Sequence, residues 1–234
     1  MNFVRKERYT IEDLLAVMEA LRSPEGCPWD REQTHASLRK CFLEETYEAV
    51  EAIDTGDVSL LEEELGDVLF QVVFHAQLEK EKGSFDFGDV VNGIAAKMVL
   101  RHPHVFGTVS VEGTEDVLRN WDAIKQKSKQ QKTQRQVLES VSKALPALMR
   151  AQKLQRKAGA GLEPQQAAAQ AEECLLQLKK GETSQEEKSD ALGRLLFAAA
   201  GLAEALHTDA EEALTRACGA FIEGFPAEEE KEKT

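Results

Sequence analysis

Five carboxylates in two short clusters are the side chains of this sequence best suited to chemistry. Glu44, Glu45 and Glu48 form an EExxE pattern, and Glu64 with Asp67 forms an ExxD pattern. Both patterns lie in stretches whose apolar residues indicate helices packed into a core. A carboxylate beside apolar surface costs on the order of several kcal/mol unless it has a partner. Too few Lys or Arg residues lie nearby to pair them all, so a divalent metal ion is the expected partner.

Helical spacing would bring these carboxylates together. Residues three or four apart share a helix face, so Glu48 projects with Glu44 or Glu45, and Glu64 projects with Asp67. A short connection between the two stretches makes the helices antiparallel neighbours, and their carboxylates can then converge. Oxygen-only ligands select hard cations such as Mg²⁺ or Mn²⁺, and several negative ligands suit more than one ion.

A solvated acidic helix face is the alternative explanation of the same pattern. Glu is a favoured residue on exposed helix surfaces, so an isolated EExxE is more often such a face than a site. Asp67 argues against this alternative, because Asp forms helices poorly and here opens the apolar run VLFQVVFHA.

Two further pairs could act on a phosphorylated substrate. Lys97 and Arg101 lie four apart at the end of a predicted helix, where they could complement the helix dipole or clamp phosphate oxygens. Trp121 and Lys125 share a face of the next helix. Trp121 could stack on a base, although a lone Trp is more often part of a core.

The composition describes a water-soluble globular protein of one large or two small domains. Hydrophobic residues make up 42% of the 234 residues, and the formal net charge is −13. Such a charge argues against binding nucleic acid through a basic surface. The four cysteines are scattered without a CxxC pair, which favours free thiols in a reducing cytosol. No signal segment and no run of about 18 apolar residues is evident, so we expect a cytoplasmic location and no membrane partner.

The whole chain is predicted to be helical. Thr10, Thr34, Asp86 and Thr114 begin helices, and Ser59 with Glu62 forms a capping-box pattern for another. The expected helices span about 10–22, 34–55, 59–82 and 86–102, followed by one from 114 and a helical region from about 144 to 224. Residues 23–34 are expected to be a turn-rich loop, 126–136 a solvated helix end or linker, and 227–234 a disordered acidic tail.

The second half weakly repeats the first. Residues 192–206 resemble 65–78, and 212–226 resemble 89–103, while Glu172 and Glu173 align with Glu44 and Glu45. The other charged positions of the first half align with residues that do not carry the same charge. Glu48, Glu64, Asp67, Lys97 and Arg101 align with Leu176, Ala191, Arg194, Ala220 and Gly224. The repeat predicts that the second half keeps the packing and has lost the metal ligands.

Five motifs together carry a family resemblance. The segments CPWDREQTHASL, LEETYEAVEAID, EELGDVLFQVVFHAQ, FDFGDVV and RHPHVFG resemble the MazG nucleoside triphosphate pyrophosphohydrolases of the all-α NTP pyrophosphatase superfamily. The match is nearly continuous over residues 10–131. A weaker likeness to a second MazG copy begins at VSKALPALMRAQKLQ (141–155). The resemblance implies an all-α fold of antiparallel helical bundles in two tandem repeats, with an intact domain at 1–131 and a degenerate one at 132–234.

The same resemblance implies an activity and residue roles. The activity is Mg²⁺-dependent hydrolysis of nucleoside triphosphates to monophosphate and pyrophosphate by a homodimer, with Mn²⁺ as a possible substitute ion and a housecleaning role in the nucleotide pool. The implied metal ligands are Glu45, Glu48, Glu64 and Asp67, and Glu44 is a further ligand or orients the attacking water. The implied substrate-binding residues are Lys97, Arg101, Trp121 and Lys125.

Two other interpretations remain open at the level of sequence. A carboxylate-bridged di-iron bundle uses a Glu-x-x-His pair on each of two helices, and this chain offers only Glu32 with His35. A nucleotide-sensing or partner-binding protein whose catalysis has decayed would keep the same fold and pocket.

Overall fold

The computed structural model describes residues 5–128, 133–159, 161, 163–179 and 184–225 of the chain. Every regular element in these ranges is a helix, which confirms the predicted all-α class. The chain divides into two compact units, Met1–Trp121 and Asp122–Thr234, each described here by itself. The domain boundary predicted between 131 and 132 lies within residues 129–132, which are outside the described residues, and the predicted acidic tail also lies outside them.

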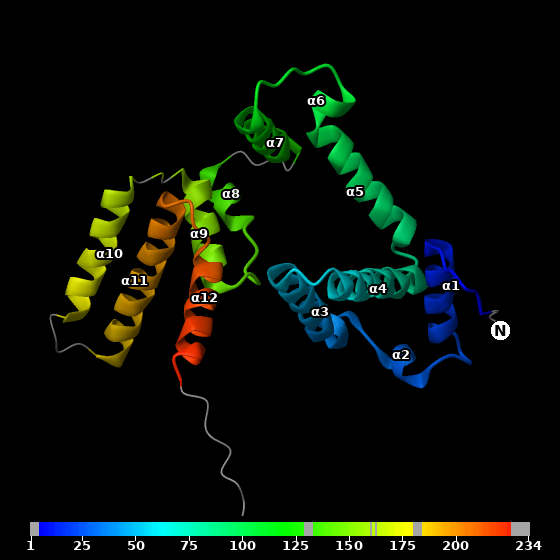
Figure 1. Ribbon diagram of the computed structural model, residues 1–234. Coiled ribbons are helices and arrows are strands. Elements are labelled where there is room, and N and C mark those ends of the chain that lie inside the picture. Colours follow the sequence, from blue (N-terminus) through cyan, green and yellow to red (C-terminus); the bar gives the residue numbers. More distant parts are fainter. Residues whose placement is uncertain (1–4, 129–132, 160, 162, 180–183, 226–234) are drawn as a thin grey trace, which may run out of the picture. The chain divides into compact units, whose positions relative to one another are not determined.

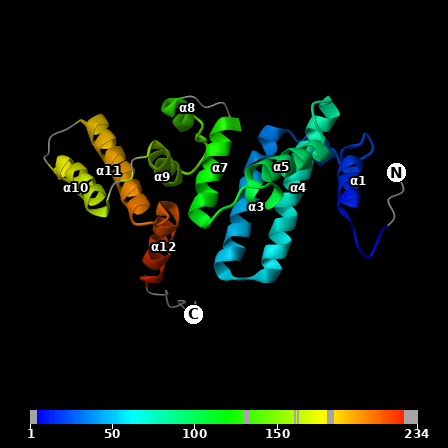
Figure 2. The same cartoon turned by 90° about the horizontal axis from the view of Figure 1, so that it is seen from above.

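A helical hairpin dominates the first unit. α3 (His35–Thr55) and α4 (Val58–Lys82) run side by side, as both views show (Figures 1 and 2). α1 (Ile11–Arg22) packs against α4, and α5 (Phe87–Arg101) continues from the end of α4. The buried core lies where α1, α3 and α4 meet, and consists of Met18, Leu38, Val73, Phe74 and Leu78. This core holds the two helices that carry the acidic clusters.

Most predicted helix ends are confirmed. Thr10, Thr34 and Asp86 each form a capping box, in which side chain and backbone exchange hydrogen bonds at the start of α1, α3 and α5. Gly56 and Gly83 end α3 and α4 in the left-handed conformation, with φ of 69° and 72°. The turn between the hairpin helices is therefore specified by a glycine where other residues would be strained.

Two local predictions are wrong. α4 is capped by Asp57, whose carboxylate accepts from the backbone N–H groups of Ser59 and Leu60 at 3.0 Å, and Ser59 lies inside the helix. The predicted loop 23–34 contains the short helix α2 (Pro28–Glu32), which Pro28 begins. The helix end predicted at 126–136 agrees with the described residues, since α7 (Thr114–Ser128) ends in this stretch and α8 (Gln134–Glu139) begins in it.

The second unit repeats this packing order. α10 (Pro164–Lys179) and α11 (Gln185–Ala205) lie side by side, α9 (Ala147–Ala158) packs on α11, and α12 (Ala210–Glu223) contacts both α9 and α11 (Figures 1 and 2). Buried Gln152 holds three of these helices together. Its amide donates to Glu204 and to the Thr208 carbonyl, and accepts from the Ala210 backbone N–H. The arrangement agrees with the predicted repeat, which stays a prediction.

Two short pieces complete the description of the chain. α6 (Pro103–Phe106) follows α5 directly, because proline fits the first position of a helix but ends the preceding one. In the described part of the chain, no helix is both long enough and apolar enough to cross a membrane.

The cap of α4 gives a test of the fold. Asp57→Ala should lower the free energy of unfolding by about 1 kcal/mol, because two backbone N–H groups lose their acceptor. Ser59→Ala, the matched control inside the same first turn, should change it by less than about 0.5 kcal/mol. Urea unfolding followed by circular dichroism measures both. An equal or larger loss of unfolding free energy in the Ser59 variant would instead support Ser59 as the cap, as predicted from sequence.

Candidate active site

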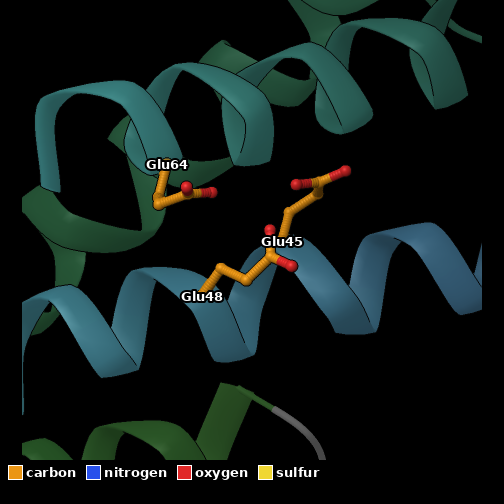
Figure 3. Close-up of side chains that lie close together, drawn as sticks. All are labelled: Glu45, Glu48 and Glu64. Carbon is orange, nitrogen blue, oxygen red and sulfur yellow. The ribbon is translucent and has the colours of Figure 1, made fainter. Parts of the chain in front are cut away.

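Three carboxylates from the two hairpin helices lie close together. Glu45 and Glu48 extend from α3 and Glu64 extends from α4 into the space between the helices (Figure 3). One oxygen from each of the three lies within 4.8 Å of the others. The EExxE and ExxD spacing predicted such a meeting for five carboxylates, and these three of the five concentrate negative charge between the helices.

Glu64 is the buried member of the cluster. It is only 8% exposed, and its Oε2 atom is buried with no hydrogen-bond partner. Burial, followed by the charges of Glu48 and Asp67, raises the pKa of the Glu64 carboxyl. Burial, followed by the charges of Asp67 and Glu48, raises the pKa of Glu45. A buried oxygen without a protein partner and carboxyl groups with raised pKa values fit a site that can hold a positive ligand.

The other two predicted carboxylates lie at the edge of this cluster. Asp67 is exposed, yet its charge acts on both Glu45 and Glu64, which places it within electrostatic reach. Glu44 is exposed and pairs with Lys40 one turn earlier on α3 at 2.9 Å. The structure thus separates a close set of three from Asp67 beside it and from Glu44, which faces a lysine.

Small residues help α3 to lie close to α4. Ala49 and Ala52 are buried on α3, where larger side chains would hold the helices further apart. Longer side chains of the same helix, such as Tyr47 and Ile53, point outward and are 59% and 61% exposed. The register of the hairpin then places Glu64 opposite the Glu45–Glu48 turn.

A second set of predicted site residues gathers at the end of α5. The Arg101 guanidinium lies over the Trp121 ring at 5.4 Å, and the His102 ring meets the same Trp121 edge-on at 4.8 Å. Arg101 is half-buried, and its Nε has no hydrogen-bond partner. Lys97 is exposed, and in the described ranges neither Lys97 nor Arg101 forms an ion pair with the carboxylates. Trp121 therefore contacts a cation, Arg101, and an aromatic ring, that of His102.

Lys125 completes the predicted substrate residues. It is half-buried on α7 one turn after Trp121, and it belongs to the second unit, which begins at Asp122.

A histidine network that the sequence reasoning missed ties the hairpin together. His35 at the start of α3 contacts His75 of α4 through their Nδ1 atoms at 2.7 Å and Glu79 through Nε2 at 2.6 Å. Hydrogen bonds from Lys82 and then from His35 lower the pKa of Glu79 to about 2. Burial, followed by His35, lowers the pKa of His75. The i, i+4 spacing of His75 and Glu79 was the available signal. His35, which the sequence also pairs with Glu32, makes these contacts to α4.

Comparison with known proteins agrees with the motifs. The MazG nucleotide pyrophosphohydrolase domain model matches residues 33–106. A nucleoside triphosphate pyrophosphohydrolase of Escherichia coli K12 is 42% identical over 224 residues, covering 92% of this chain and 85% of that protein. The nucleoside triphosphate pyrophosphohydrolase/pyrophosphatase MazG of Thermotoga maritima is 40% identical over 223 residues, covering 94% and 85%. This chain belongs to the MazG family.

The family match covers some of the predicted site residues and not others. The matched MazG segment contains all five carboxylates and also Lys97 and Arg101, whereas Trp121 and Lys125 lie beyond it. A crystal structure of a mazG-related protein from Thermotoga maritima is 27% identical and covers 49% of this chain and 98% of its own, with a TM-score of 0.42. That structural likeness is too low to add to the sequence comparison.

The crowded carboxylates should make the metal-free protein sensitive to pH. Because the pKa of Glu64 is raised above its ordinary 4.5, the folded protein binds this proton more tightly than the unfolded chain. The resulting stabilisation is complete below about pH 4.5 and is lost as the pH rises through the raised pKa. Glu64→Gln removes this loss, so in excess chelator the variant should gain stability over wild type progressively as the pH rises above about 4.5 and through the raised pKa of Glu64.

Thermal unfolding at a series of pH values measures this difference directly. Glu62→Gln, an exposed position half a turn away on α4, is the control and should show no such trend. A stability difference between Glu64→Gln and wild type that stays constant with pH, or that the control variant shares, would contradict a raised pKa at Glu64.

Proposed function

We propose that this MazG-family chain is a Mg²⁺-dependent enzyme that hydrolyses nucleoside triphosphates to nucleoside monophosphate and pyrophosphate. The observation that supports it most is the close set of Glu45, Glu48 and Glu64, with its buried Oε2 atom that has no partner. The named activity of relatives that this chain matches over most of their length points to the same reaction. Removal of modified triphosphates from the nucleotide pool is the cellular role that we propose for it.

The residues fit a hard divalent cation. All the donors in the cluster are carboxylate oxygens, the ligand type that Mg²⁺ and Mn²⁺ prefer, and no Cys or His belongs to it among the described residues. Glu45, Glu48 and Glu64 would hold the ion, with Asp67 close enough to join them. When bound, the ion would supply positive charge to the triphosphate and make water easier to deprotonate.

The remaining residues would position the substrate. Glu44, exposed on α3 and paired with Lys40, would be a further metal ligand or would orient the attacking water. Lys97 and Arg101 would bind phosphate oxygens, and the planar Arg101 fork suits two oxygens at once. Trp121, with Lys125 one turn further on, would cover the nucleotide while its ring keeps Arg101 in place. Direct attack by water needs no covalent nucleophile.

We further propose that the protein works as a homodimer. The hairpin helices expose large apolar side chains that a monomer would leave in water, among them Leu43, Tyr47, Ile53 and Leu65, each more than half exposed. A second copy of the same hairpin would cover this surface and would narrow the space beside the carboxylates.

Hydrolysis by the full chain tests the proposed reaction. With Mg²⁺, a panel of ordinary and modified triphosphates should yield pyrophosphate and monophosphate, and diphosphates should react little. Glu48→Gln should lower kcat at least ~100-fold, because even partners outside the metal ligands contribute about 10- to 100-fold. Glu51→Gln, exposed one turn further on α3, is the control and should stay near wild type. Nucleotide binding with no turnover would instead support a sensor.

The contact between Arg101 and Trp121 gives a second kinetic test. Arg101→Lys keeps the charge and loses the planar fork, so KM for a triphosphate should rise about tenfold. Arg119→Lys on α7, where Arg119 pairs with Asp116, is the matched control and should leave KM unchanged. Steady-state kinetics at saturating Mg²⁺ measure both. An unchanged KM in the Arg101 variant would exclude it from phosphate binding.

A further inference from the structure

The second unit contains a cavity, broadly open to solvent, that none of the proposed chemistry uses. Residues of α9, α10 and α11 line a space of about 740 Å³. Small-molecule sites in proteins typically occupy about 300–1,000 Å³. The cavity is therefore large enough for a ligand the size of a nucleotide, and all its walls belong to one compact unit.

The cavity lies where the repeat would place the counterpart of the carboxylate cluster. Its lining includes Glu173 and Arg194, which align with Glu45 and Asp67 of the first half. Glu173 lies in the middle of α10 and Arg194 in the first half of α11. These two helices pack on each other as α3 and α4 do. The same part of the helical hairpin is thus open in the second unit.

The chemistry of this counterpart is different. Glu48 and Glu64 align with Leu176 and Ala191, so two of the carboxylates have no equivalent. Where Asp67 stands in the first half, Arg194 brings a fixed positive charge into the cavity wall. These residues cannot bind a divalent cation as the carboxylates of the first unit can. A guanidinium, in contrast, can bind phosphate oxygens directly.

Arg194 is also available for a ligand. It is exposed, and within the described residues no carboxylate pairs with it, although Glu173 and Asp190 line the same cavity. Phe197 presents a ring that is 46% exposed, and the exposed Gln170 and Gln177 offer amide groups. A planar ring surface, amides that can donate and accept, and one cation are the parts that a base and a single phosphate need.

We propose that this cavity binds a nucleoside monophosphate without a metal ion. Arg194 binds the phosphate, Phe197 contacts the base, and Gln170 and Gln177 hydrogen-bond to its edge. Arg194 is the one cation among the described residues that line this cavity, so it can bind a single phosphate, whereas a triphosphate would bring more negative charge beside Glu173 and Asp190 than one guanidinium can offset. The choice of a nucleotide rests on the function proposed for the first unit, since a monophosphate is the product of that reaction.

Calorimetric titration of the full chain in excess EDTA tests this site apart from the first. AMP, GMP, CMP and UMP are titrated separately, and at least one should bind. Arg194→Ala should weaken that binding about ten- to a hundredfold, the effect of losing hydrogen bonds to a charged group. Arg216→Ala on α12, where Arg216 pairs with Glu212, is the control and should bind as wild type does. Glu48→Gln should also bind as wild type does.

The outcomes separate this inference from the proposed activity. No binding of any monophosphate in EDTA, or binding that Glu48→Gln abolishes and Arg194→Ala leaves intact, would overturn it. Arg194→Lys, which keeps the charge, should retain part of the affinity and shows whether loss in the alanine variant reflects misfolding. Mg²⁺-dependent hydrolysis by Arg194→Ala should stay at the wild-type rate, so failure of hydrolysis would count only against the first unit's function.

Discussion

Electrostatic repulsion between carboxylates held in the α3–α4 hairpin is the constraint on which the site depends. The helix caps, the glycine turn and the core around Phe74 bring Glu45, Glu48 and Glu64 within one metal ion's reach. Burial, and then the charges of the neighbouring carboxylates, raise the pKa values of Glu45 and Glu64, so this arrangement is unfavourable without a cation. A fold that maintains such crowding uses packing energy to keep a site ready for a positive ligand.

The hairpin resists the repulsion at its other end. The network of His35, His75 and Glu79 joins the first turn of α3 to the second half of α4, far along both helices from the carboxylates. Arg22 adds a link from α1 to Glu81 at 2.7 Å. These contacts fix the register of the two helices, and register decides whether Glu64 faces Glu45 and Glu48 or points away from them.

Sequence reasoning predicted the features governed by local rules. Thr34 and Asp86 have the side chains and spacing of capping boxes, and the three- and four-residue spacing of the carboxylates fixes a shared helix face. It failed where two local signals competed. Ser59 and Asp57 both suit a helix start, and the backbone entering α4 is extended at Asp57, so that residue is the cap.

Contacts between distant residues were beyond the reach of local patterns. The partners of His35 lie on another helix, and the packing of Arg101 on Trp121 depends on how the chain turns through Pro103 and Gly107. The unequal surroundings of the five carboxylates were equally hidden, because spacing alone does not say that Glu64 is buried while Glu44 pairs with Lys40. The motifs nevertheless identified the family, whose members named as pyrophosphohydrolases share about two fifths of their aligned residues with this chain.

The affinity of the cluster for Mg²⁺ is the most direct measure of whether these carboxylates form a metal site. Calorimetric titration of nucleotide-free protein with MgCl₂ near neutral pH should show saturable binding, and repeating it in buffers of different ionisation enthalpy should reveal proton release from the carboxyls. Glu64→Gln should weaken this binding about tenfold or more, since one charged ligand is lost. Saturable uptake that the Glu64 variant leaves unchanged, or no uptake at millimolar Mg²⁺ with wild type, would contradict the account.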